Sequence, residues 1–129
     1  MEPKAVVLSV FRDLHENPRA SLSEVERWIS PHYRQNVDGK TMCFSEYVEH
    51  FKALQSAASS FKIDVLETVC EGNRVCTRHR VHLNKRDGSS ALVGVIAVFE
   101  VENDQIVRVD ELTQLIEGSH EDKDLGSRT

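Results

Sequence analysis

The fold is decided by residues 61–116, which read FKIDVLETVCEGNRVCTRHRVHLNKRDGSSALVGVIAVFEVENDQIVRVDELTQLI. Apolar and polar residues alternate through most of this stretch, and a period of two is typical of β-strands. Turn signals divide it into about four strands, at Glu71-Gly72-Asn73, Lys85-Arg86-Asp87-Gly88 and Asn103-Asp104. The third strand, 91–101, is apolar in both phases, so we expect a central strand that is covered on both faces. These patterns predict a mostly antiparallel sheet.

Three amphipathic helices are predicted before the sheet. They run from Pro3 to Asn17-Pro18, from Ser21 to Ser30-Pro31, and from about Phe44 to Ala58. A proline ends each of the first two because the residue before a proline is pushed out of the helical region. The connector between the second and third helices, residues 32–39, is predicted to be a loop that ends in a turn. Helices followed by a sheet predict an α+β fold in which the helices cover one sheet face.

The composition indicates one soluble globular domain. The chain has 129 residues, of which 40% are hydrophobic and 29% charged, and this length is enough to bury a core. We assign the domain to residues 1–117. Residues 118–129 are short of apolar side chains, so we expect them to form a disordered acidic tail.

Charge, hydropathy and cysteine content disfavour several classes of protein. The net charge of −5 disfavours nucleic acid as a partner, since phosphate binding draws on clustered basic charge. No apolar run approaches the roughly 18 residues of a membrane span, so we expect no membrane partner. Cys43, Cys70 and Cys76 are odd in number and form no CxxC motif, which predicts a reduced, cytoplasmic protein.

Three segments resemble one known family. Residues 71–79 read EGNRVCTRH, residues 97–107 read AVFEVENDQIV, and Tyr33-Arg34-Gln35-Asn36 precedes a glycine-containing turn and the third helix. Over roughly residues 6–115 the chain resembles the nuclear transport factor 2-like superfamily, in its SnoaL-like branch. The resemblance implies a cone in which a strongly curved sheet and the helices enclose a deep, largely apolar pocket for a small hydrophobic ligand. It also implies a homodimer.

Members of that superfamily include ketosteroid isomerase, scytalone dehydratase, limonene-epoxide hydrolase, polyketide cyclases and many proteins that only bind. The chain departs from the family's pattern at four positions. The frequent histidine of the connector is Asn36, and the usual tryptophans fall on His79 and Asp110. Gln114 stands where an aspartate is often found. No single family mechanism is therefore carried over whole, and only the fold transfers.

His79 and Glu111 are the main catalytic candidates. Both fall in the apolar phase of their strands, so the alternation places both side chains on the interior face. Burial raises the pKa of a carboxyl group toward values that suit acid–base catalysis. The alternative is a structural hydrogen-bonded pair in the core. Asp110 is in the opposite phase, with Arg108; the resemblance keeps it as a further candidate, because a β-bulge would reverse that phase.

Other residues are candidates for substrate binding. Tyr33 and Asn36 offer hydrogen bonds from the connector, and the isomerase relatives make Tyr33 a candidate oxyanion donor. A tyrosine that caps the core is the alternative. Trp28, Phe51 and Phe99 are candidates for the pocket wall.

The remaining polar residues give no pattern for a cofactor or a metal. His32, His50 and His82 have no partners at ligand spacing and are interpreted as surface or incidental residues. A metal site needs three or four converging ligands, and the sequence has no motif of that kind. We expect neither a metal nor a cofactor.

Three functions remain open at this point. The first is a cofactor-independent acid–base enzyme of the isomerase, dehydratase, cyclase or epoxide hydrolase type, acting on a small hydrophobic or carbonyl-containing molecule. The second is a non-catalytic small-ligand-binding or dimerisation module in which His79 and Glu111 form a structural pair. The third is a protein-transport adaptor, which needs exposed apolar docking grooves.

Overall fold

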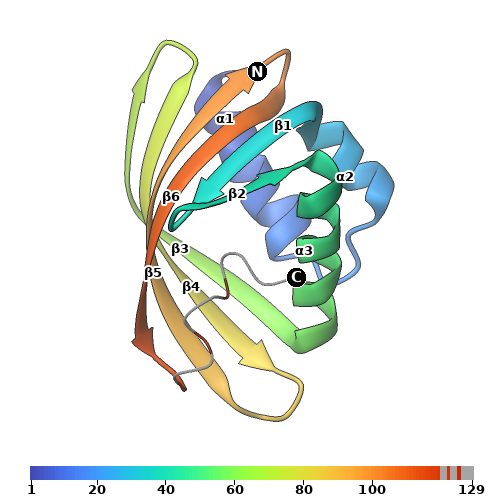
Figure 1. Ribbon diagram of the computed structural model, residues 1–129. Coiled ribbons are helices and arrows are strands. Elements are labelled where there is room, and N and C mark those ends of the chain that lie inside the picture. The colour runs from blue at the N-terminus through green and yellow to red at the C-terminus, as the bar shows by residue number, and fades with distance from the viewer. Residues whose placement is uncertain (120–121, 123–124, 126–129) are drawn as a thin grey trace.

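The computed structural model describes residues 1–119, 122 and 125. The helical elements are α1 (Pro3–Val10), the π-helix η1 (Phe11–His15), α2 (Leu22–Trp28) and α3 (Phe44–Ala57). The strands are β1 (Ile29–Val37), β2 (Lys40–Cys43), β3 (Ala58–Glu71), β4 (Arg74–Lys85), β5 (Ser90–Glu102) and β6 (Gln105–Glu117). The six strands form one sheet in the order β2-β1-β6-β5-β4-β3. The sheet curves around the helices, which all lie on its concave side (Figure 1).

This arrangement confirms the predicted α+β fold of three N-terminal helices on a curved, mostly antiparallel sheet. Only β1 and β6 pair in parallel, whereas the other neighbouring strands pair antiparallel. The local signals act as predicted. Ser21 caps α2 by accepting a hydrogen bond of 3.4 Å from the backbone N–H of Glu24, and Pro3 stands in the first turn of α1.

The connector was expected to be a loop, and this expectation is wrong. Residues 32–37 belong to β1, and the Asp38-Gly39 turn joins β1 to β2 in a hairpin. The strand is hard to recognise in the sequence because every second residue is polar and faces solvent, as His32, Arg34 and Asn36 do. The residues between and after them are buried: Tyr33, Gln35 and Val37. The pairing with β6, far along the chain, supplies hydrogen bonds that no local pattern reveals.

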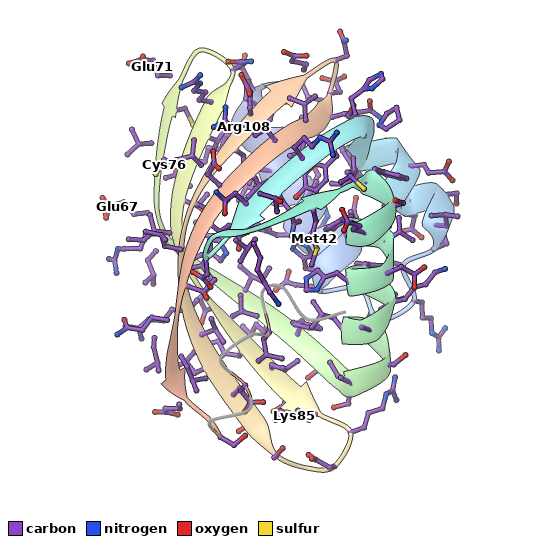
Figure 2. The ribbon with its side chains drawn as sticks, viewed as in Figure 1. Met42, Glu67, Glu71, Cys76, Lys85 and Arg108 are labelled. Carbon is purple, nitrogen blue, oxygen red and sulfur yellow. The ribbon has the colours of Figure 1, made fainter. Side chains whose placement is uncertain are left out.

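The four strands expected within residues 61–116 are present as β3 to β6, and β5 is central as expected. The expected cover on both faces of β5 is absent in the single chain: Ile96 is 54% exposed and Val98 40%, while their neighbour Ala97 is buried. Glu67 and Cys76 also point away from the helices on this outer face, while Met42 lies between the sheet and α3 (Figure 2). The apolar residues of one phase of β5 therefore face the helices, and those of the other phase lie on an outer face that is exposed in the single chain.

The end of the chain is described only in part. The prediction of a disordered tail from residue 118 falls mostly on residues outside those described, and it stays a prediction. Asp122 is buried in an ion pair with Lys85, and Leu125 is buried against the core. No helix in the described part of the chain is long and apolar enough to cross a membrane.

Candidate functional site

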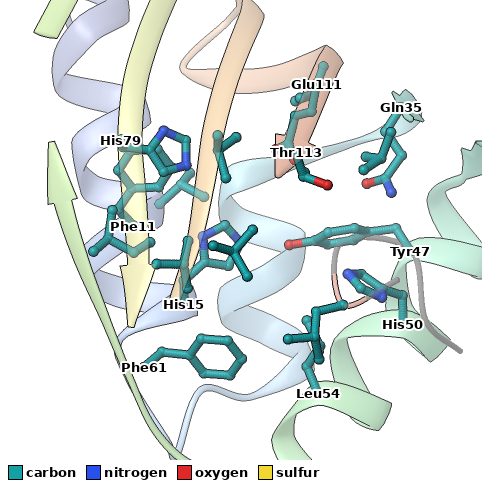
Figure 3. Close-up of a pocket in the computed structure, with 18 of the residues that line it drawn as sticks. Phe11, His15, Gln35, Tyr47, His50, Leu54, Phe61, His79, Glu111 and Thr113 are labelled. Carbon is teal, nitrogen blue, oxygen red and sulfur yellow. The ribbon is translucent and has the colours of Figure 1, made fainter. Parts of the chain in front are cut away.

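A cavity of about 120 Å³ lies between the concave face of the sheet and the helices. Its wall is mostly apolar and includes Phe11, Phe61, Val95 and Phe99. The polar lining residues come from five separate parts of the fold: His15, Tyr33, Gln35, Tyr47, His50, His79, Glu111 and Thr113. In Figure 3, Phe11, His15 and His79 lie on one side of the cavity and Gln35, Tyr47 and His50 on the other. A ligand in this space meets polar groups on opposite walls.

Glu111 projects into the cavity from β6, and its neighbour Asp110 does not. Asp110 lies on the outer face, where it accepts a hydrogen bond of 2.7 Å from Arg108. The register between β5 and β6 is regular from Glu100–Arg108 to Val93–Leu115, so no bulge reverses the phase at Asp110. The structure therefore removes the geometric basis for Asp110 as a catalytic candidate.

The carboxyl group of Glu111 is surrounded by apolar side chains and two tyrosines. Its pKa is raised to about 7, chiefly by burial and in smaller part by the nearby negative charge of Asp38. The pKa values of Tyr33 and Tyr47 are raised as well, chiefly by burial and in part by Glu111. Near neutral pH, Glu111 is present in both its protonated and its ionised form, while both phenols keep their protons.

His79 lies on the opposite wall, in β4. Its Nδ1 is 2.8 Å from Oγ1 of Thr77, which is fully buried, and its ring packs on Phe11 with the ring centroids 4.8 Å apart. Burial lowers the pKa of His79 to about 4, so the imidazole is neutral at pH 7. Because Thr77 engages Nδ1, the ring nitrogen Nε2 is the one that can meet a ligand.

His79 and Glu111 line one cavity but do not form the predicted pair. Across the sheet, His79 is opposite Val95 and Glu111 is opposite Ala97, with β5 between the two strands. Two strand spacings alone separate the backbones by about 10 Å. Among the described residues no hydrogen bond or ion pair joins the two side chains. The phase of a strand predicts which face a side chain occupies, but not its partner across the sheet.

Two further histidines line the cavity. His15 is the last residue of η1, and its ring lies against Phe11 with centroids 5.8 Å apart. Its pKa is lowered to about 4 by burial and then by His79 and His50. His50 is buried in α3 near Tyr47, so its interpretation as a surface residue is wrong. The helical spacing was the available signal, since His15 follows Phe11 by four residues and His50 follows Tyr47 by three.

The predicted binding residues divide into two groups. Tyr33 and Phe99 line the cavity, and the hydroxyl of Tyr33 donates a hydrogen bond of 2.9 Å to Oε1 of Gln35. Asn36 faces solvent, where its side chain accepts a hydrogen bond of 3.0 Å from the backbone N–H of Gly39. Trp28 and Phe51 are core residues outside the cavity wall. Asn36, Trp28 and Phe51 therefore lie outside the lining of this cavity, and a binding role for them stays a prediction.

The described residues include no group of three or more His, Cys, Asp or Glu side chains arranged to hold a metal ion. The three cavity histidines come from η1, α3 and β4 and do not converge on one point of coordination. The titratable groups that line the cavity are one carboxyl group, two phenols and three imidazoles.

Comparison with known sequences identifies one family. The SnoaL-like domain matches residues 10–109. An uncharacterised protein from Schizosaccharomyces pombe is 36% identical over 100 residues, which cover 78% of this chain and 77% of the relative.

Solved structures share the fold at low sequence identity. IdmH of Streptomyces antibioticus, described as a proposed polyketide cyclase, has a TM-score of 0.75 at 12% identity and covers 88% of this chain and 93% of its own. An LEH-like epoxide hydrolase from M. tuberculosis has a TM-score of 0.72 at 16% identity, with 88% and 83% covered. AclR of Streptomyces galilaeus, described as a proposed hydroxylase, has a TM-score of 0.73 at 16% identity, with 88% and 75% covered. These likenesses show a shared fold, and the match to the SnoaL-like domain confirms the predicted family resemblance.

Proposed function

The chain belongs to the SnoaL-like domain family, and we propose that it binds a small uncharged molecule in the cavity and that Glu111 moves a proton to or from that molecule. The observation that carries this proposal is the carboxyl group of Glu111, which faces an apolar cavity and has a pKa of about 7. A group that titrates near the working pH is available both as acid and as base. Reactions of the isomerase, dehydratase, cyclase and epoxide hydrolase types all need such a group.

The lining favours a neutral ligand with an oxygen function. A cavity of about 120 Å³ suits a compact molecule, since an apolar cavity of about 150 Å³ accommodates benzene. No lysine or arginine is among the described lining residues, and His15 and His79 are neutral at pH 7. An anionic ligand would lose its hydration without gaining a cation. A ketone, an epoxide or an alcohol loses much less hydration free energy on entering the cavity.

The groups around Glu111 suit the charge changes of such a reaction. When Glu111 removes a proton from carbon, negative charge develops on the ligand oxygen, and a preorganised donor stabilises it. The hydroxyl of Tyr47 points into the cavity (Figure 3) and can donate to that oxygen. Nε2 of His79 faces the ligand from the opposite wall and is a second donor in the tautomer in which Thr77 donates to Nδ1. Tyr33 is held by Gln35 and supports the wall beside Tyr47, with the two rings 5.1 Å apart.

A ligand screen followed by substitution tests this function. Neutral acyclic and one-ring ketones and epoxides are screened for a rise in melting temperature, which reports binding to the folded state. Compounds that bind are then assayed for conversion with the wild type, with Glu111→Gln and with the control Asp110→Asn. We expect Glu111→Gln to bind and not to convert, and Asp110→Asn to do both. Conversion by Glu111→Gln at the wild-type rate would refute the role of Glu111.

The second candidate is non-catalytic binding of the same class of ligand. It is favoured by the separation of His79 from Glu111, because no acid–base pair is assembled in advance across the cavity. Under this alternative, compounds that raise the melting temperature are recovered unchanged, and the wild type and Glu111→Gln bind them equally. The screen therefore separates the two candidates.

We also propose that the outer face of the sheet pairs two copies of the chain as a homodimer. Exposed aliphatic side chains lie together there on β5 and β6: Ile96, Val98, Leu112 and Ile116. A two-fold axis over such a face sets the same patch against itself. We expect light scattering to give the mass of two chains, and Leu112→Asp to give the mass of one. A wild type with the mass of one chain at high concentration would contradict the dimer.

A reducing compartment such as the cytoplasm is the environment that we propose for this protein. Cys43, Cys70 and Cys76 are all free thiols, and Cys70 is exposed. Exposed thiols persist where glutathione and thioredoxin keep them reduced. Fractionation of cells followed by immunodetection tests this location.

A further inference from the structure

The turn between β1 and β2 contacts β6 at Glu111. Val37, the last residue of β1, is opposite Glu111 in the parallel pair, and the next residue, Asp38, donates its backbone N–H to the carbonyl oxygen of Glu111 at 3.0 Å. Asp38 has a φ of 52°, in the left-handed region that few residues other than glycine, asparagine and aspartate adopt. This conformation directs the backbone of the turn onto β6.

The side chain of Asp38 contacts the same strand two residues further on. Its Oδ1 accepts a hydrogen bond of 2.8 Å from the backbone N–H of Thr113, and its Oδ2 accepts one from the hydroxyl of Thr113. Thr113 lines the cavity beside Glu111 (Figure 3). Asp38 thus binds β6 at the carbonyl of Glu111 and, two residues further on, at the amide and hydroxyl of Thr113.

We propose that Asp38 is a positioning residue for Glu111, which fixes the segment of β6 that carries Glu111 and holds a second carboxylate beside the cavity. This proposal rests on the proposed role of Glu111 in proton transfer. Asp38 itself is exposed and is not part of the cavity wall. Its effect on a ligand therefore passes through Glu111 and Thr113.

The negative charge of Asp38 raises the pKa of Glu111 toward neutral pH, where the proposed proton transfer requires it. The other titratable groups that line the cavity with Glu111 are Tyr33 on β1, Tyr47 and His50 on α3, His15 on η1 and His79 on β4. The two tyrosines, His15 and His79 are uncharged near pH 7. Burial is the larger cause of the raised pKa of Glu111, and Asp38 is the charged group that adds to it. Removing this charge lowers the pKa of Glu111 without opening the cavity.

Two variants separate the charge of Asp38 from its hydrogen bonds. Asp38→Asn removes the charge, tolerates the left-handed conformation and keeps an oxygen acceptor for the amide of Thr113. Asp110→Asn is the matched control, because it removes an equal charge from the residue next to Glu111 on the outer face. Asp38→Ala removes both the charge and the acceptor.

The first measurement is the pKa of Glu111 by NMR titration of its side-chain carboxyl carbon in the free protein. We expect Asp38→Asn to lower the midpoint by on the order of 0.5 to 1 pH unit and Asp110→Asn to leave it unchanged. Equal midpoints in the wild type and in Asp38→Asn would overturn the electrostatic part of the proposal.

The second measurement is hydrogen exchange at the amide of Thr113. We expect exchange to become roughly tenfold faster in Asp38→Ala, and to stay within about twofold of the wild type in Asp38→Asn. Unchanged exchange in Asp38→Ala would overturn the positioning part. Neither measurement needs a substrate, so both remain decisive if no compound is converted. Conversion by Glu111→Gln, in contrast, would refute the proposed function and leave these two results standing.

Discussion

The two faces of the sheet give the same kind of side chain different properties. Asp110 and Glu111 are neighbours on β6, yet Asp110 pairs with Arg108 in solvent while Glu111 faces an apolar cavity beside two tyrosines. The pKa of Glu111 is raised to about 7 because burial disfavours its charged form. Strand alternation decides which carboxylate receives which environment. The environment of a carboxyl group in this sheet therefore depends on the face that it occupies and not on its residue type.

The largest expected effect of this difference is on turnover. Glu111→Gln keeps the shape of the side chain and removes its proton transfer, so we expect the rate with an identified substrate to fall about 10²- to 10⁴-fold. Asp110→Asn should stay within about twofold of the wild type, because it changes only the outer face. Steady-state kinetics on both variants measures the contrast. A comparable loss in Asp110→Asn would remove the distinction between the faces.

Stability should show the same contrast on β5. Phe99 is buried against Phe11, with ring centroids 5.8 Å apart, whereas Val98 beside it is 40% exposed. We expect Phe99→Ala to lower the free energy of unfolding by about 3 kcal/mol. Val98→Ala should change it by no more than about 0.5 kcal/mol. Urea unfolding at low protein concentration, where each chain is measured alone, gives both values.

The pH dependence of stability offers a sharper contrast between the two carboxylates. The folded-state pKa of Glu111, about 7, is higher than its ordinary value of 4.5, so the folded protein binds this proton more tightly than the unfolded chain. The associated stability is complete below about pH 4.5 and is lost as the pH rises through 7. We therefore expect Glu111→Gln to gain stability relative to the wild type between pH 4.5 and 8, by up to about 3 kcal/mol.

His15 and His79 act in the opposite direction over part of the same range. Their folded-state pKa values of about 4 are lower than the ordinary 6.5, so their contribution is present above pH 6.5 and is lost as the pH falls through 4. Both proteins contain His15 and His79, so the contribution of these histidines cancels when the stabilities of Glu111→Gln and the wild type are compared at each pH. A stability difference that does not vary with pH would contradict the raised pKa of Glu111.

The smallest expected effect belongs to Asn36 on the outer side of β1. Its side chain accepts a hydrogen bond from the amide of Gly39 in the β1–β2 turn and lies outside the cavity. We expect Asn36→Ala to lower the free energy of unfolding by about 1 kcal/mol and to leave ligand binding unchanged. Tyr33→Phe, a change in the cavity wall, is the control that should alter binding. Calorimetry with a ligand from the screen distinguishes the two.

Local signals predicted much of this fold. Pro3, the cap at Ser21 and the turn glycines act over a few residues, so the sequence alone identifies them. The sheet face on which Glu111 lies is predictable in the same way, because the alternation of side chains is a property of one strand. β1 was not predicted because its polar residues face solvent and because its pairing partner, β6, is far along the chain.

The candidate site was predicted in part. Glu111, His79, Tyr33 and Phe99 do line the cavity, yet His79 and Glu111 lie two strands apart, since register between strands depends on turns and bulges along the whole sheet. The contact between Asp38 and Thr113 also depends on that register. The sequence signal for His15 was its spacing from Phe11, while the π-helical turn that ends the first helix is a local geometry that the sequence does not predict.

The titration of Glu111 in the wild-type protein tests the central claim most directly. The side-chain carboxyl carbon is followed by NMR from pH 3 to pH 9, and Glu111→Gln assigns its signal. We predict a midpoint near pH 7, set by burial in the cavity and by Asp38. A midpoint near the ordinary value of 4.5 would show that Glu111 is solvated like a surface carboxylate, and would contradict its proposed role in proton transfer.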